Sequence, residues 1–234
     1  PEPGAAIEAA LAGSGLAPRG WLLPDAHSSP RMSDGSPAAV LCLIGHGGGE
    51  FWPVFETWWH QNPAEEEPLD SWARTVIDPV ALAAGGEAVY PSDRPWHPFQ
   101  QWAMAAEDLK PSPLGLLMHP VYGLWHGYRG AILFRDAGAY VSDPSRPGTV
   151  GRSPEPSGRH ACDGCLSKPC LSACPVGAFS ATGFAVNDCR SHLSGTIGQE
   201  GCMQTGCMAR DACPFGREFR YSPSQIRFHM RAFA

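Results

Sequence analysis

Hydrophobic positions along the first 140 residues form two kinds of pattern, continuous apolar runs and helical spacing. Ala38–Ile44 is a continuous apolar run, and its length suits a strand buried on both faces. Glu50–His60 and Leu69–Ala84 have apolar residues at helical spacing, although Pro79 should kink or split the second helix. The other predicted elements here are helices at 1–15 and 98–108 and strands at 20–23, 88–90, 114–118 and 124–134.

The pattern changes after residue 141. Residues 142–158 are rich in Pro, Ser and Gly without an apolar period, which is typical of a linker, and residues 159–221 have almost no periodic pattern. Ser222 is a good N-cap followed by Pro at the first helical position, so a helix should cover 222–234. We therefore predict an α+β protein with a mixed α/β domain over 1–141, the linker, a small domain over 159–221 and a C-terminal helix.

Composition and charge narrow the classes of protein. The net charge of −6 disfavours a general nucleic-acid binder, because such proteins are usually basic. No run of 18 apolar residues is present and no signal peptide is visible, so we expect a cytoplasmic protein without a membrane segment. All eight tryptophans lie between Trp21 and Trp125, whereas eight of the nine cysteines lie between Cys162 and Cys213. This partition predicts two domains with different roles.

The cysteine spacing is the most specific signal in the chain. Two runs, at 162–175 and 202–214, each end in Cys-Pro, and Cys189 lies between them. The bacterial ferredoxin run C-x2-C-x2-C-x3-C-P is similar, and its fourth cysteine ligates the other cluster when two are present. Interleaving then predicts two [4Fe–4S] clusters. The first set is Cys162, Cys165, Cys170 and Cys213, and the second is Cys174, Cys189, Cys202 and Cys207.

Other uses of these cysteines fit less well. Zinc sites usually take two short C-x2-C pairs, and only one is present here. Eight cysteines also allow 105 disulfide pairings, but those are typical of secreted chains. Each oxidised all-thiolate cluster would carry roughly −2. The basic residues of this region either offset that charge or are ordinary solvated surface: Arg152, Arg159, Lys168, Arg190, Arg210, Arg217 and Arg220.

The order of the eight cysteines, with Cys189 between the two runs and Cys174-Pro175-Val176-Gly177-Ala178 after the first, resembles the ferredoxin-like domain of epoxyqueuosine reductase. It also resembles that of related corrinoid-dependent reductases. Residues 119–130 are similar to a stretch in cobalamin-processing proteins. This resemblance implies a nitroreductase-like N-terminal domain that holds a corrinoid.

The resemblance predicts a reductase. Its clusters would pass electrons from a donor such as a flavodoxin or ferredoxin to a cobalamin, or to a flavin, that acts on a small-molecule substrate. His119, Trp125, Tyr128 and Arg129 are the candidate cofactor-binding residues, although such a histidine can be satisfied at a turn and such aromatics can fill a core. No catalytic residue is identified. The alternative function is a ferredoxin-type electron-transfer protein without its own catalysis.

Overall fold

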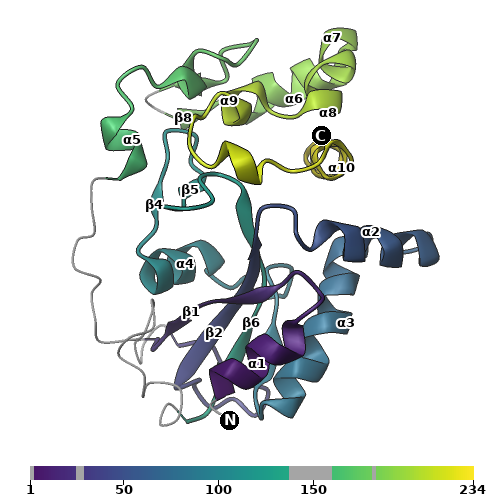
Figure 1. Ribbon diagram of the computed structural model, residues 1–234, viewed down its shortest axis with the longest axis vertical. Helices are drawn as coiled ribbons and strands as arrows, with labels where there is room; N and C mark the ends of the chain where they lie inside the picture. Colours follow the sequence, from purple (N-terminus) through teal and green to yellow (C-terminus); the bar gives the residue numbers. More distant parts are fainter. Residues whose placement is uncertain (1–2, 25–28, 137–159, 181–182) are drawn as a thin grey trace. The chain divides into compact units, whose positions relative to one another are not determined.

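The computed structural model describes residues 3–24, 29–136, 160–180 and 183–234 (Figure 1). Helices and strands are mixed along the chain, which confirms the α+β class. The described residues form two compact units. Unit 1 draws on Pro1–His46, Glu50–Leu109 and Gly127–Ser157, and unit 2 on Gly47–Gly49, Lys110–His126 and Gly158–Ala234.

This division differs from the predicted domains, because residues 47–49 and 110–126 belong to unit 2 and not to unit 1. Both segments had been placed in the domain over 1–141. The predicted linker over 142–158 lies outside the described residues.

Unit 1 contains a four-stranded sheet of order β1-β2-β6-β3. Strand β1 pairs antiparallel with β2, and β3 pairs antiparallel with β6. Helix α4 packs against β1, and α1 contacts both β1 and α3. The elements are α1 (Pro3–Leu11), β1 (Ala17–Leu22), β2 (Val40–Gly47), α2 (Trp52–Gln61), α3 (Pro68–Ala83), β3 (Glu87–Val89), α4 (Phe99–Glu107) and β6 (His126–Phe134).

Strand β2 confirms the prediction made from its apolar run. Each residue from Val40 to Ile44 is fully buried, so the strand has core on both faces. Cys42 is part of this run, and its thiol donates weakly to the carbonyl oxygen of Leu43 at 3.8 Å. The ninth cysteine is therefore a small core side chain.

Helices α2 and α3 bring an aromatic cluster into the core of unit 1. The rings of Phe51 and Trp72 stack with centroids 5.6 Å apart, and Phe55 packs edge-on against Trp72 at 5.7 Å. Of the two outcomes predicted for Pro79, a kink or a split of the helix, the split does not occur, since one helix covers the whole segment. Pro79 and Thr75 are both exposed, so water can hydrogen-bond the Thr75 carbonyl that the proline leaves without a donor.

Unit 2 consists of short elements, as its lack of periodicity predicts. Two two-stranded ribbons, β4-β5 and β7-β8, accompany helices of which only α6 and α10 exceed two turns. The elements are β4 (Lys110–Pro111), β5 (Leu117–Met118), α5 (Ala161–Gly164), η1 (Pro169–Leu171), β7 (Phe179–Ser180), β8 (Gly183–Phe184), α6 (Val186–Ser194), α7 (Thr196–Glu200), α8 (Cys202–Thr205), α9 (Met208–Asp211), η2 (Arg217–Phe219) and α10 (Pro223–Phe233).

The strand predicted over 114–118 is shorter in the structure. Only Leu117 and Met118 pair, with Pro111 and Lys110. The preceding residues form a turn, because the Ser112 N–H donates to the Leu116 carbonyl at 2.7 Å and Gly115 adopts a φ of +75°. Similarly, the strand predicted from residue 124 begins at His126.

Helix α10 confirms the predicted start signal. The Ser222 hydroxyl oxygen accepts a hydrogen bond from the Gln225 N–H at 3.3 Å, and Pro223 is the first helical residue. Ile226 then packs in a small core with Trp125 and Tyr221. The C-terminal helix is thus an integral part of unit 2.

Candidate functional site

Four cysteines of unit 2 lie close enough to influence one another's ionisation. Burial raises the pKa of the Cys162 thiol to about 11, and the thiols of Cys213, Cys170 and Cys165 act in the same direction. The pKa of Cys170 is raised too, by burial first and then by Cys213 and Cys165. These are the four cysteines that the interleaved spacing assigns to the first cluster.

The same four cysteines line a common cavity. Cys162 is in α5, Cys165 ends that helix, and Cys170 lies in η1, so three thiols come from one short stretch. Cys213 joins them from beyond α9. The rest of the wall is mainly apolar and includes Leu114, Met118, Leu124 and Pro214. Such a wall limits the access of water to whatever the thiols hold.

The other four cysteines form a second group. Burial raises the pKa of the Cys189 thiol, and Cys207, Cys174 and Cys202 are the charged neighbours that raise it further. Cys189 is in α6, Cys202 begins α8, and Cys207 directly precedes α9. Cys174 comes from the first cysteine run. This group therefore combines one cysteine of the first run with three later ones.

Backbone N–H groups point at several of these sulfur atoms. The Ala178 N–H donates to the sulfur of Cys174 at 3.3 Å. The N–H groups of Arg210 and Ala209 hydrogen-bond the sulfur of Cys207, which works against the effect of burial on its pKa. Such bonds favour the thiolate, the form that ligates metal. They are also among the features that set the potential of an iron–sulfur cluster.

The donor set of each group fits a [4Fe–4S] cluster. Each consists of four free thiols that are partly or fully buried. Among the residues that the structure describes, no three His, Cys, Asp or Glu side chains are close enough to bind a single metal ion. A cubane spreads its four thiolates around four iron atoms, so the looser groups found here are compatible with it.

The four candidate cofactor-binding residues are divided between the units: His119 and Trp125 belong to unit 2, and Tyr128 and Arg129 to unit 1. The His119 ring takes part in its own turn. Its Nδ1 accepts hydrogen bonds from the N–H groups of Val121 at 3.0 Å and Tyr122 at 3.1 Å. Nδ1 therefore carries no proton, and this contact matches the turn alternative raised for His119.

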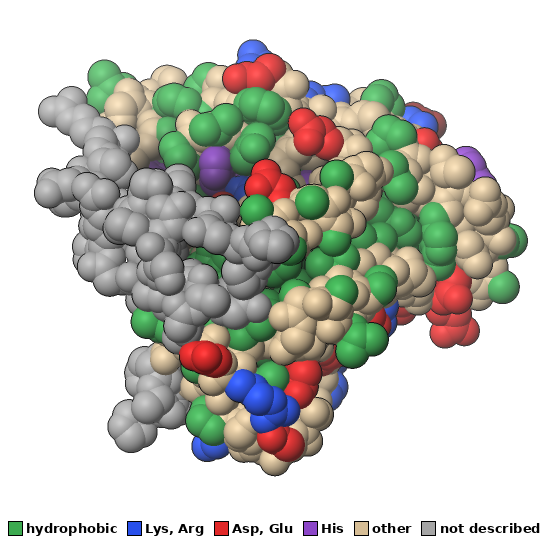
Figure 2. All heavy atoms as spheres, turned by 60° about the horizontal axis from the view of Figure 1, so that its bottom comes forward, with side chains coloured by type: hydrophobic (Ala, Val, Ile, Leu, Met, Phe, Trp, Pro, Cys, Tyr) green, Lys and Arg blue, Asp and Glu red, His purple; other side chains and the backbone are tan. Residues whose placement is uncertain are grey.

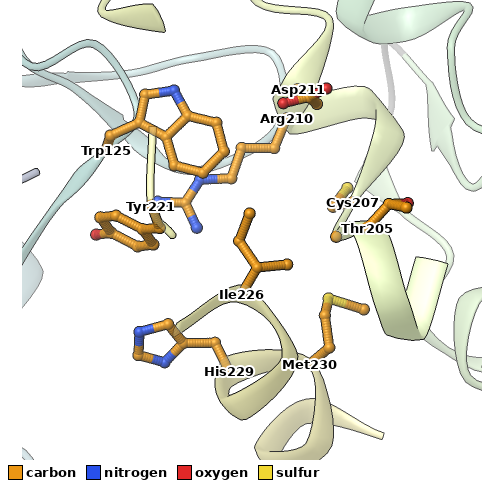
Figure 3. A pocket seen from close by; sticks show the side chains of 10 residues that line it. Trp125, Thr205, Cys207, Arg210, Asp211, Tyr221, Ile226, His229 and Met230 are labelled. Atoms are coloured by element: carbon orange, nitrogen blue, oxygen red, sulfur yellow. The ribbon is translucent and has the colours of Figure 1, made fainter. Parts of the chain in front are cut away.

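Trp125 lies beside the second cysteine group. It is buried, and its ring packs edge-on against Tyr221 with centroids 5.2 Å apart. Trp125, Tyr221 and Cys207 line one cavity of about 50 Å³, together with side chains of α10 (Figure 3). A cavity of this size can hold a few water molecules or a small group.

Tyr128 belongs to a buried polar network in unit 1 that the sequence did not indicate. Its hydroxyl donates to the carboxylate of Glu107, which also accepts from Arg19 at 3.0 Å and 3.3 Å. The Arg19 and Glu107 side chains are only 6% and 11% exposed. Burial raises the pKa of Glu107, although Arg19 and Tyr128 oppose that effect. No local pattern could have paired two residues so distant in the chain.

Arg129 lies near Phe51, with its guanidinium carbon 5.9 Å from the ring centroid.

Comparison of the chain with protein-family models, curated proteins and solved structures finds no match. Among the described residues, no helix has both the length and the apolar character needed to cross a membrane.

In the described part of the face shown in Figure 2, Lys and Arg side chains lie beside Asp and Glu. This mixed charge differs from the single-sign patches of nucleic-acid binders.

Proposed function

We propose that this chain is an iron–sulfur redox protein that binds two [4Fe–4S] clusters. The observation that carries the proposal is the division of eight thiols into two groups of four, each with one member from the opposite cysteine run. The first cluster would be held by Cys162, Cys165, Cys170 and Cys213, and the second by Cys174, Cys189, Cys202 and Cys207.

Each cluster, when bound, would supply one-electron transfer. The chain's own part is to hold the thiolates, to donate N–H groups to their sulfur atoms, and to keep water away from them with residues such as Leu114 and Met118. Because the two groups exchange Cys174 and Cys213, the clusters would lie in one intertwined loop system. Electrons could then pass between them without leaving unit 2.

The cluster proposal is tested by anaerobic reconstitution of the purified chain with iron and sulfide. We expect about eight iron and eight sulfide per chain, together with the electron paramagnetic resonance signals of reduced cubanes. A Cys42→Ala variant is the matched control, since Cys42 lies in strand β2 of unit 1 and belongs to neither group. Stoichiometric zinc without sulfide would contradict the proposal.

We further propose that the electrons reduce a corrinoid, or a flavin, for which Trp125 is the candidate contact in unit 2. The support is the sequence resemblance of residues 119–130, which contain all four of the candidate residues. The test is titration of the anaerobic protein with cobalamins and flavins, followed by visible absorption outside the cluster bands. Saturable binding, weakened by Trp125→Ala, is expected.

A plain electron-transfer protein is the second candidate. The observation in its favour is that the Nδ1 of His119 is already occupied by two N–H groups of its turn. If the loaded protein binds neither cobalamins nor flavins but exchanges electrons with a flavodoxin or ferredoxin, this second function replaces the reductase.

A further inference from the structure

Arg210 contacts two aromatic rings beside the second cysteine group. Its guanidinium carbon lies 4.2 Å from the ring centroid of Trp125 and 4.7 Å from that of Tyr221. Figure 3 shows the guanidinium beside both rings. A terminal N–H donates to the Leu124 carbonyl at 2.5 Å. Arginine binds well to aromatic faces, so two rings and a carbonyl hold this charge in one place.

This fixed charge is next to the second cysteine group. Arg210 follows Cys207 by three residues, lines the same cavity, and donates its backbone N–H to the Cys207 sulfur. Its sequence neighbour Asp211 does not compete for the guanidinium, because Asp211 forms an ion pair with Arg220.

Three other arginines of unit 2 make different contacts. Arg190 donates to the Phe233 carbonyl at 3.2 Å. Arg220 lies farther from the Trp125 ring centroid, at 5.8 Å, and is engaged by Asp211 and by the Thr205 carbonyl. Arg217 is exposed in the short helix η2. The sequence left open whether these residues offset cluster charge or are solvated surface, and the geometry distinguishes Arg210 from Arg217.

We propose that Arg210 is a positioning residue that sets the reduction potential of the cluster bound through Cys207. A reduced cluster carries one more negative charge than the oxidised one, so a fixed cation beside it favours the reduced form. The electron comes from a one-electron carrier, and Arg210 neither gains nor loses a proton. This inference rests on the proposed function, because it requires that the second cluster is present.

The test is a redox titration of the reconstituted full chain, with dithionite as reductant and electron paramagnetic resonance as the readout. The signal of the second cluster is assigned by its loss in Cys189→Ala. In Arg210→Gln we expect the midpoint of that cluster to move to a more negative value, with a smaller change for the other cluster. Arg217→Gln removes the same charge from an exposed position, and we expect both midpoints to stay in place.

Equal shifts in Arg210→Gln and Arg217→Gln, or no shift in the former, would overturn the role of Arg210. If the Arg210→Gln variant does not bind the second cluster, the midpoint potentials are compared in the Arg210→Lys and Arg217→Lys variants instead. Lysine keeps the charge but loses the flat contact with two rings, so a smaller negative shift is expected only at position 210. A wild-type chain that binds no iron and sulfide would instead overturn the proposed function together with this inference.

Discussion

The carboxylate of Asp34 accepts hydrogen bonds from the N–H and the hydroxyl of Ser36 and forms an ion pair with Arg135. The Ser36 hydrogen bonds contribute most to lowering its pKa from 3.8 to about 2, and Arg135 adds to the effect. A depressed carboxyl pKa stabilises the folded state above the unfolded pKa, and this stability is lost as the pH falls toward 2.

We therefore expect Asp34→Asn to lower the free energy of unfolding at pH 6 but to have a smaller effect at pH 2.5. The measurement is denaturant unfolding of both proteins at each pH, and the difference between them cancels any acid damage that they share. If the two proteins differ in unfolding free energy by the same amount at both pH values, the lowered pKa of Asp34 does not stabilise the folded state.

Substitution of Cys174 tests whether each cluster takes one cysteine from the other cysteine run. We expect Cys174→Ala to lose the cluster of Cys189, Cys202 and Cys207 and to keep the other, because Cys174 is the fourth thiol of the second group. Iron and sulfide should fall to about half of the wild-type content. Iron and sulfide analysis with paramagnetic resonance makes the measurement. Loss of the cluster held by its near neighbours in sequence, with the second kept, would show that the interleaving is wrong.

At the scale of elements, helix α10 depends on its first residue. Ser222→Ala removes the acceptor of the Gln225 N–H, and an N-cap is worth about 0.5–2 kcal/mol. We expect a loss of that order in the unfolding free energy of unit 2, measured by denaturant unfolding of the reconstituted protein.

The rescue variant for this helix is Ser222→Asp, because aspartate is as good an N-cap as serine. Its stability should be close to that of the wild type. Equal losses in both variants would show that the hydroxyl acts through something other than the cap.

At the end of β2, the backbone at Gly47 and Gly49 passes close to other side chains of unit 2. A Cβ on Gly47 would lie 2.2 Å from ring atoms of Tyr122, and one on Gly49 would lie 2.7 Å from Oε1 of Gln225. Both partners are in unit 2 and far away in sequence. Gly47 is therefore required by its close approach to the Tyr122 ring, whereas the contact at Gly49 is with the end of the Gln225 side chain.

At the scale of the whole molecule, the two units differ in what stabilises them. Unit 1 has a sheet and an aromatic core. In unit 2, two of the described hydrophobic clusters include the cysteines themselves, and another consists of Trp125, Tyr221 and Ile226 with their neighbours. Metal–thiolate bonds supply folding free energy when a core cannot. Unit 2 should therefore depend on its clusters.

We expect removal of the clusters by oxidation and chelation to expose the amides of unit 2 and to leave those of unit 1 protected. Hydrogen exchange measured segment by segment makes this comparison, with the reconstituted protein as reference. Equal loss of protection in β2 and in α10 would contradict it.

The sequence alone determined the features whose signals are local. The apolar run of β2, the N-cap of α10 and the spacing of the eight cysteines each lie within a short stretch, and local backbone preferences and ligand spacing can be recognised there. The fold class followed from the same signals.

The tertiary structure decided the rest. It placed residues 110–126 in unit 2, joined Arg19 to Glu107, and brought Arg210 against Trp125 and Tyr221. Each of these contacts joins residues far apart in the chain. The periodicity of a sequence shows only which face of an element is apolar. It does not show which distant residue will contact that face or pair with a given charge.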